Sequence, residues 1–124
     1  MKTKILIAIS DTNLANTIMS ISTKHGYISE FVKNGNDVIH ELLRAQPDLL
    51  IIDLNLPEKS GYDVLNEKSF DRNVTKIPVI IVSNSGDPIQ MKKIPSTPTI
   101  RDYMIAPHID AEDLMKKVAK VLNS

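Results

Sequence analysis

The chain has 124 residues with 15 basic and 15 acidic side chains, so its formal net charge is zero, and it contains no cysteine. Disulfides, thiolate catalysis and cysteine metal sites are therefore excluded, and the interspersed charges favour neither nucleic acid nor a membrane as a partner. The length suits one domain, residues 1–124. The apolar run after Lys4 is too short for a signal peptide or a membrane span, so we expect a cytoplasmic protein.

Short aliphatic runs alternate with segments whose apolar residues recur at helical spacing, which is typical of strands alternating with helices. Asp11 or Thr12 could cap the first helix, and Asp110 with Asp113 resembles a capping box for the last one. In chain order the sequence predicts a strand at 5–9, a helix from 11 or 12 to 26, a strand at 27–32, a helix between 34 and 47, a strand at 49–53, a short helix after 61, strands at 79–82 and 100–105, and a last helix after 110.

The stretch between 82 and 100 does not fit this alternation well. Only residues 87–93 are available for a helix there, because Pro95 and Pro98 cannot occupy a helix interior. We therefore expect a short or irregular fourth helix. The alternation as a whole predicts an α/β fold of three layers, with about five helices around a doubly wound, five-stranded parallel sheet in the flavodoxin-like order 2-1-3-4-5.

Asp53 is the most informative residue, because it closes the aliphatic run at 49–52. A strand packed on both faces consists of consecutive aliphatic residues, so this carboxylate lies at the carboxyl end of a central strand, where open α/β sheets bind ligands. The ends of the neighbouring strands bring Ile9, Ser10 and Asp11, Ser83, and Ala106 with Pro107 to the same edge. Two carboxylates and a hydroxyl could therefore meet there.

The segment from Pro47 to Gly61 carries a demanding pattern. It consists of Pro-Asp, four aliphatic residues, Asp53, a proline four residues later and a glycine eight residues later. Together with Asn34-Gly35, and with Tyr103 followed by Pro107, this pattern resembles the receiver domain of two-component response regulators along the whole chain.

The resemblance implies phosphoryl transfer from a histidine kinase or a phosphotransfer protein to Asp53. In that family an acidic pair, the acceptor and a backbone carbonyl hold Mg²⁺, which offsets the repulsion between the carboxylate and the incoming phosphoryl group. Mapped onto this sequence, Asn55 supplies the carbonyl, Ser83 the hydroxyl that holds a phosphoryl oxygen, and Tyr103 the switch aromatic. Ser83 could equally be a turn residue and Tyr103 plain packing.

Two requirements of the family are missing at their expected places. The acidic pair maps to Ile9 and Ser10, and a lysine maps to Ala106. Asp11 is displaced by one position, so it is either a metal ligand after a one-residue shift of its loop or a helix cap. Because Mg²⁺ depends on very few protein ligands, we expect its binding to be weakened.

Three functions remain open at this point. The first is a stand-alone receiver, not an enzyme beyond its own phosphorylation and dephosphorylation, which binds a protein target through residues 87–93, the strand at 100–105 and the last helix. The second is a pseudo-receiver, an atypical binding module that keeps the fold without the phosphorylation switch. The third is a flavin or another phosphate-bearing cofactor at the loop after the first strand, supported only by the hydroxyls of Ser10, Thr12 and Thr17 in a loop that lacks glycine.

Overall fold

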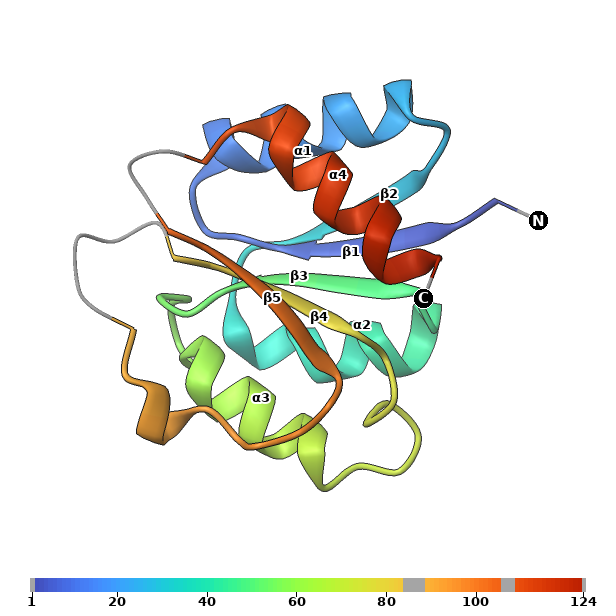
Figure 1. Cartoon of the computed structure of the whole chain (residues 1–124). Helices are drawn as coiled ribbons and strands as arrows, with labels where there is room; N and C mark the ends of the chain where they lie inside the picture. The colour runs from blue at the N-terminus through green and yellow to red at the C-terminus, as the bar shows by residue number, and fades with distance from the viewer. Residues whose placement is uncertain (1, 84–88, 106–108, 124) are drawn as a thin grey trace.

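The computed structural model describes residues 2–83, 89–105 and 109–123. Its five strands form one parallel sheet in the order β2-β1-β3-β4-β5, which confirms the predicted topology (Figure 1). The elements are β1 Lys4–Ala8, α1 Thr12–Lys24, β2 Ile28–Val32, the 3₁₀ turn η1 Gly35–Asp37, α2 Val38–Ala45, β3 Leu49–Asp53, α3 Gly61–Ser69, β4 Val79–Ser83, the 3₁₀ turn η2 Met91–Lys93, β5 Ile100–Ile105 and α4 Ala111–Leu122.

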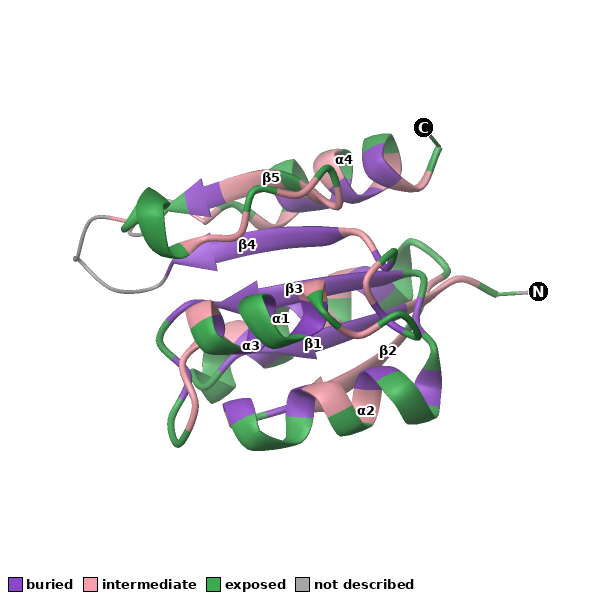
Figure 2. Cartoon of the chain, turned by 90° about the horizontal axis from the view of Figure 1, so that it is seen from below, coloured by how far each residue is buried: buried purple, intermediate pink, exposed green. Residues whose placement is uncertain are grey.

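Two apolar layers lie on opposite faces of the sheet. Helices α1 and α4 cover one face, and α2 and α3 cover the other (Figure 1). In β3, Leu49 and Ile51 belong to the layer under α1 and α4, whereas Leu50 and Ile52 belong to the layer under α2 and α3. Strands β3 and β4 are buried along their whole length, as Figure 2 shows. A continuous aliphatic run suits a strand that is packed on both faces.

The helix ends follow from short-range hydrogen bonds. Asp11 is the N-cap of α1, and past the end of this helix Gly26 takes a φ of 85°, a left-handed conformation that favours glycine. Ser60 caps α3 and Asp110 caps α4 through side-chain oxygens. Two strand starts differ by one residue from the prediction, since β1 begins at Lys4 and β2 at Ile28.

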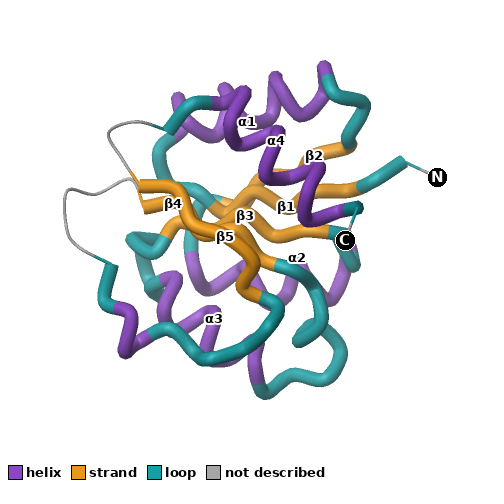
Figure 3. Tube along the Cα trace, viewed as in Figure 1, coloured by secondary structure: helices purple, strands orange, loops and turns teal. Residues whose placement is uncertain are grey.

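The expected irregular fourth helix is confirmed within the described residues. Between β4 and β5 the described part of the chain forms only the three-residue turn η2 (Figure 3). The described residues as a whole therefore form four α-helices and two 3₁₀ turns, where the sequence predicted about five helices. Pro95 and Pro98 lack the backbone N–H that a longer helix would need. No helix in the described ranges is long and apolar enough to cross a membrane.

Candidate functional site

Asp53 and Ser83 are the last residues of two adjacent strands, β3 and β4, and each is only 2% exposed. Asp53 pairs with Val82, so Ser83 lies one residue further along the neighbouring strand. The Asp53 carboxylate accepts a hydrogen bond from the backbone N–H of Asn55, with 2.9 Å between Oδ1 and N. The carboxyl edge of the sheet thus brings a buried carboxylate and a buried hydroxyl to neighbouring strand ends, as the topology predicts.

The loop that follows Asp53 is closed tightly by Gly61. The N–H of Gly61 donates to the carbonyl of Leu54 at 2.9 Å, and a Cβ on Gly61 would lie 2.4 Å from the carbonyl oxygen of Asp53. A side chain at this position would therefore displace the backbone at the end of β3. The glycine of the sequence pattern has a physical reason, which is the close approach of α3 to the end of β3.

A second glycine locks the same loop from the other side. The N–H of Gly35 donates to the carbonyl of Pro57 at 3.0 Å, and a Cβ on Gly35 would lie 1.7 Å from the carbonyl oxygen of Lys59. Between these contacts Glu58 has a φ of 70°, a left-handed conformation that is uncommon for a residue with a side chain. The backbone around the β3–α3 loop is therefore strongly constrained.

The loop after β1 is not built like an acidic site. Ile9 is 0% exposed and packs in the apolar layer under α1 and α4, while its N–H donates to the carbonyl of Val32 at 3.2 Å. Ser10 is exposed. Asp11 is also exposed, and its Oδ1 accepts the N–H of Leu14 at 3.1 Å, as expected of a helix cap.

The donors at this edge do not reproduce the Mg²⁺ site that the sequence resemblance implies. The positions of the acidic pair hold Ile9, which lies in the core, and Ser10, which is exposed. The remaining oxygen ligands expected for the metal are the Asp53 carboxylate and the Asn55 carbonyl. Asp11 accepts a hydrogen bond from its own helix. Within the described ranges no group of three or more His, Asp or Glu side chains could hold a metal ion. Magnesium prefers oxygen ligands in near-octahedral geometry and usually takes one or two carboxylates.

Tyr103 lies in β5 opposite Ile81 of β4 and is half-buried against the layer under α2 and α3. The backbone at this point is held by Asp102, whose Oδ1 accepts the Tyr103 N–H at 2.8 Å and whose Oδ2 lies 3.1 Å from Lys117 Nζ on α4. Burial raises the pKa of the Asp102 carboxyl, but the bonds from Tyr103 and Lys117 outweigh it and leave the pKa lowered. Ala106 and Pro107, at the other predicted positions, lie outside the described residues.

Two side chains that sequence reasoning passed over stand out in the structure. Tyr62, the second residue of α3, accepts the backbone N–H of Gln90 on its hydroxyl at 2.9 Å. Lys68 is buried, and its Nζ donates to the carbonyl of Thr75 at 3.0 Å. Burial lowers the pKa of the Lys68 ammonium to about 8. Neither contact has a sequence signal, because both depend on how loops after α3 and β4 fold back onto that helix.

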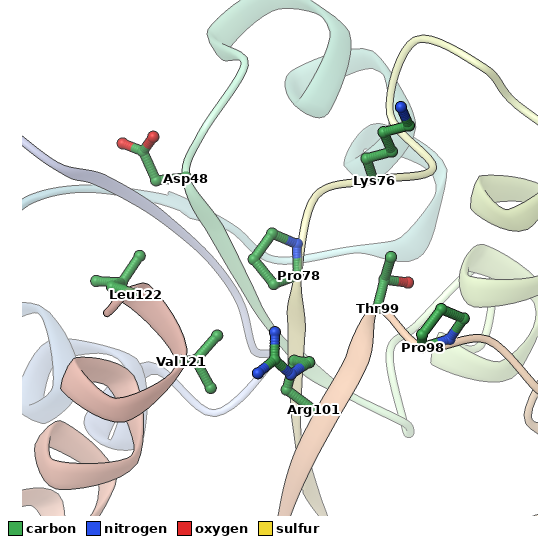
Figure 4. Close-up of a pocket in the computed structure, with 8 residues that line it drawn as sticks. All are labelled: Asp48, Lys76, Pro78, Pro98, Thr99, Arg101, Val121 and Leu122. Atoms are coloured by element: carbon green, nitrogen blue, oxygen red, sulfur yellow. The ribbon is translucent and has the colours of Figure 1, made fainter. Parts of the chain in front are cut away.

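A further cavity lies at the opposite, amino-terminal edge of the sheet, and Figure 4 shows the residues that line it. Its volume is about 330 Å³, and the guanidinium of Arg101 points between Val121 and Pro78 (Figure 4). Arg101 is the extra residue where the pairing of β5 with β4 shifts, since Val79 pairs with Ile100 and Ile80 with Asp102. This cavity is separate from the residues that the sequence pattern singles out.

Comparison with known proteins agrees with the fold. Residues 5–119 match the model of the response regulator receiver domain. Protein PilH of Pseudomonas aeruginosa is 28% identical over 119 residues, which are 96% of this chain and 97% of PilH. The sensory transduction protein RegX3 of Mycobacterium tuberculosis is 29% identical over 120 residues, which are 97% of this chain but 51% of RegX3.

Among solved structures, the receiver domain of the sensor histidine kinase PA1611 from Pseudomonas aeruginosa superimposes with a TM-score of 0.85. It is 18% identical, the match covers 100% of both chains, and that structure holds a magnesium ion in its active-site cleft. At this identity the likeness supports the fold alone. The match to the family over nearly the whole chain decides the assignment: the chain belongs to the receiver domains of response regulators, the signalling domains of two-component systems.

Proposed function

We propose that this chain is a pseudo-receiver, which signals through protein–protein contacts that do not require phosphorylation of Asp53. The observation that carries the proposal is the environment of Ile9. This residue takes the place of a metal-binding carboxylate and is fully buried in the apolar core, so the loop is anchored by its side chain. An apolar side chain that is buried in the core cannot serve as an oxygen ligand for a cation at that position.

Charge balance supports the same conclusion. Phosphorylation of Asp53 would replace a carboxylate of charge −1 by an acyl phosphate of about −1.5 to −2 charges at pH 7. That charge needs a cation nearby. Asp11, which could help to hold a metal ion, caps α1 instead, and the lysine position of the family holds Ala106. Magnesium at Asp53 and the Asn55 carbonyl would have a single carboxylate ligand, so we propose that its binding is weak.

The partners are proteins of a two-component system. We propose docking to a histidine kinase or phosphotransfer protein, and a downstream target on the face formed by η2, β5 and α4. In support, Met91 in η2 is 58% exposed and Ile105 at the end of β5 is 57% exposed. Lys92 and Lys93 directly follow Met91 and are also exposed. Apolar anchors with charged neighbours are typical of protein interfaces.

A second candidate is phosphorylation at Asp53. The observation in its favour is that Asp53 and Ser83 end adjacent strands. In addition, Gly61 and Gly35 pack closely on the loop that follows Asp53. In that case the Ser83 hydroxyl would bind a phosphoryl oxygen and Tyr103 would act as the switch aromatic. The chain would then catalyse, at most, its own phosphorylation and dephosphorylation.

Amide spectra distinguish the two candidates. ¹H–¹⁵N correlation spectra of the wild type are recorded with and without acetyl phosphate and magnesium, and Asp53→Asn serves as the matched control. If the chain is a pseudo-receiver, the amide resonances of residues 89–105 should have the same positions in both conditions. Shifts that appear in the wild type and are absent from Asp53→Asn would reject the pseudo-receiver in favour of the second candidate.

A further inference from the structure

Tyr62 joins helix α3 to the turn η2 by two separate contacts. Its hydroxyl accepts the backbone N–H of Gln90 at 2.9 Å. On the same segment, Lys93 Nζ lies 5.9 Å from the centroid of the Tyr62 ring, within the range of a cation–π interaction. Figures 1 and 3 show η2 beside the beginning of α3. A single side chain thus holds both ends of the turn.

The turn has little stability of its own. It consists of three residues, and Gln90 at its N-cap makes no side-chain cap hydrogen bond. Isolated helical segments far shorter than about 12 residues are unstable in water. On the side of β5 lies a cavity of about 270 Å³. It is lined by Met91 and Ile94 from the turn and its C-cap, and by Ile100 and Tyr103 from β5. The position of η2 therefore depends on the helix to which Tyr62 ties it.

The other neighbour of Tyr62 is the loop of Asp53. Gly61 precedes Tyr62 directly, and its N–H is bonded to the carbonyl of Leu54 with the Asp53 backbone in close approach. In addition, Asn55 from this loop and Gln90 and Lys93 from the η2 segment line one hollow of about 500 Å³. A displacement of the loop would therefore move Tyr62, and Tyr62 would carry the η2 segment with it.

We propose that Tyr62 is a positioning residue that couples the β3–α3 loop at Asp53 to the η2 segment, residues 89–94. The coupling runs through α3 and needs neither the hydroxyl of Ser83 nor a movement of Tyr103. It goes beyond the pseudo-receiver proposal, because it states how any change at the Asp53 loop, whatever its source, reaches this segment. Such coupling requires an element with more than one conformation, whose equilibrium is shifted from both sites; here the element is η2, and the two sites are the Asp53 loop and the surface of η2 itself.

The test uses the full chain without a phosphodonor, so its result does not depend on whether Asp53 is phosphorylated. Tyr62→Phe removes the acceptor of the Gln90 N–H and keeps the ring under Lys93. Tyr27→Phe is the matched control, because Tyr27 packs on the opposite face of the sheet. We expect amide exchange at Gln90 to be at least about fivefold faster in Tyr62→Phe, as the loss of one hydrogen bond implies, and unchanged in Tyr27→Phe.

The coupling itself has a separate readout. Asp53→Asn changes the charge of the loop but keeps an oxygen for the Asn55 N–H, and we expect it to shift the amide resonances of residues 89–94 when Tyr62 is present. In the Tyr62→Phe background the same substitution should shift them by less than half as much. Equal shifts in both backgrounds, no shift in either, or unchanged exchange at Gln90 would each overturn the proposal. Exchange of β3 amides reports whether Tyr62→Phe remains folded.

Discussion

The backbone N–H of Leu14 donates to Oδ1 of Asp11 at 3.1 Å. Asp11 is the first acidic residue of the sequence, and the next is Glu30. Because Asp11 is the N-cap of α1, the carboxylate near the loop after β1 contributes an oxygen to the start of this helix. The contact between these two residues thus gives Asp11 a role in the stability of α1.

Substitution of Asp11 separates its capping role from a role in metal binding. Asp11→Ala should lower the free energy of unfolding by about 1 kcal/mol, whereas Asp11→Asn keeps the capping oxygen and should cost a few tenths of that. Urea unfolding with and without magnesium provides the measurement. A magnesium-dependent stabilisation of the wild type that Asp11→Asn abolishes would instead identify Asp11 as a metal ligand.

The two positions of the missing acidic pair should respond very differently to an added carboxylate. Ile9→Asp would bury a charge in the apolar layer and should destabilise the fold by more than about 3 kcal/mol. Ser10 is exposed, so Ser10→Asp should change stability by less than about 0.5 kcal/mol. Ile9→Val is the control and should cost about 1 kcal/mol. A well-folded Ile9→Asp variant in thermal unfolding would show that this loop is not anchored by its side chain.

Gly61→Ala tests how tightly the loop of Asp53 is closed. Its Cβ would lie 2.4 Å from the carbonyl oxygen of Asp53, so the backbone must move, and we expect a loss of about 1–3 kcal/mol. At Gly26 the added Cβ would meet nothing within 4 Å. Gly26→Asn, which tolerates a positive φ, should therefore cost less than Gly61→Ala. Equal losses of stability in urea unfolding would contradict the packing argument.

Lys68 gives the fold a pH dependence of known sign. Its pKa is about 8 in the folded chain against 10.5 for the unperturbed group, because burial disfavours the charged form. Between these values the unfolded state binds more protons, so the free energy of unfolding should rise from pH 8 to pH 10.5, by at most about 3 kcal/mol. Below pH 8 this contribution should be flat.

Lys68→Met is the control for that pH dependence. The difference in stability between wild type and Lys68→Met should change between pH 8 and pH 10 and remain constant from pH 6 to pH 7.5, since other titrating groups cancel in the comparison. Chemical denaturation at a series of pH values provides the measurement. A parallel pair of stability curves over the alkaline range would mean that burial does not lower the pKa of Lys68 in the folded chain.

Much of the fold was predictable because continuous aliphatic runs and proline positions are local signals. The strands at 49–53 and 100–105 have the predicted bounds. The prolines at 95 and 98 correctly indicated that the described residues before β5, 89–99, form only the short turn η2 and no full helix. The end of β1 was misplaced by one residue because Ile9, although apolar and buried, follows the last strand residue, Ala8.

The site was predictable only in part. Strand ends and topology located Asp53 and Ser83 at one edge of the sheet, since parallel strands end together. The role of Tyr62 could not be read from the sequence, because its contacts with Gln90 and Lys93 join segments that are about 30 residues apart. The choice between cap and metal ligand for Asp11 also needed the backbone geometry of α1.

The central claim is that Asp53 is not used as a phosphoryl acceptor, and intact-mass spectrometry tests it most directly. Wild type, Asp53→Asn, and a variant that combines Ser10→Asp with Ala106→Lys are each incubated with acetyl phosphate and magnesium. We predict no added phosphoryl mass on the wild type and a measurable gain on the double substitution, which restores a carboxylate and the lysine. A phosphoryl group on the wild type that is absent from Asp53→Asn would contradict the claim.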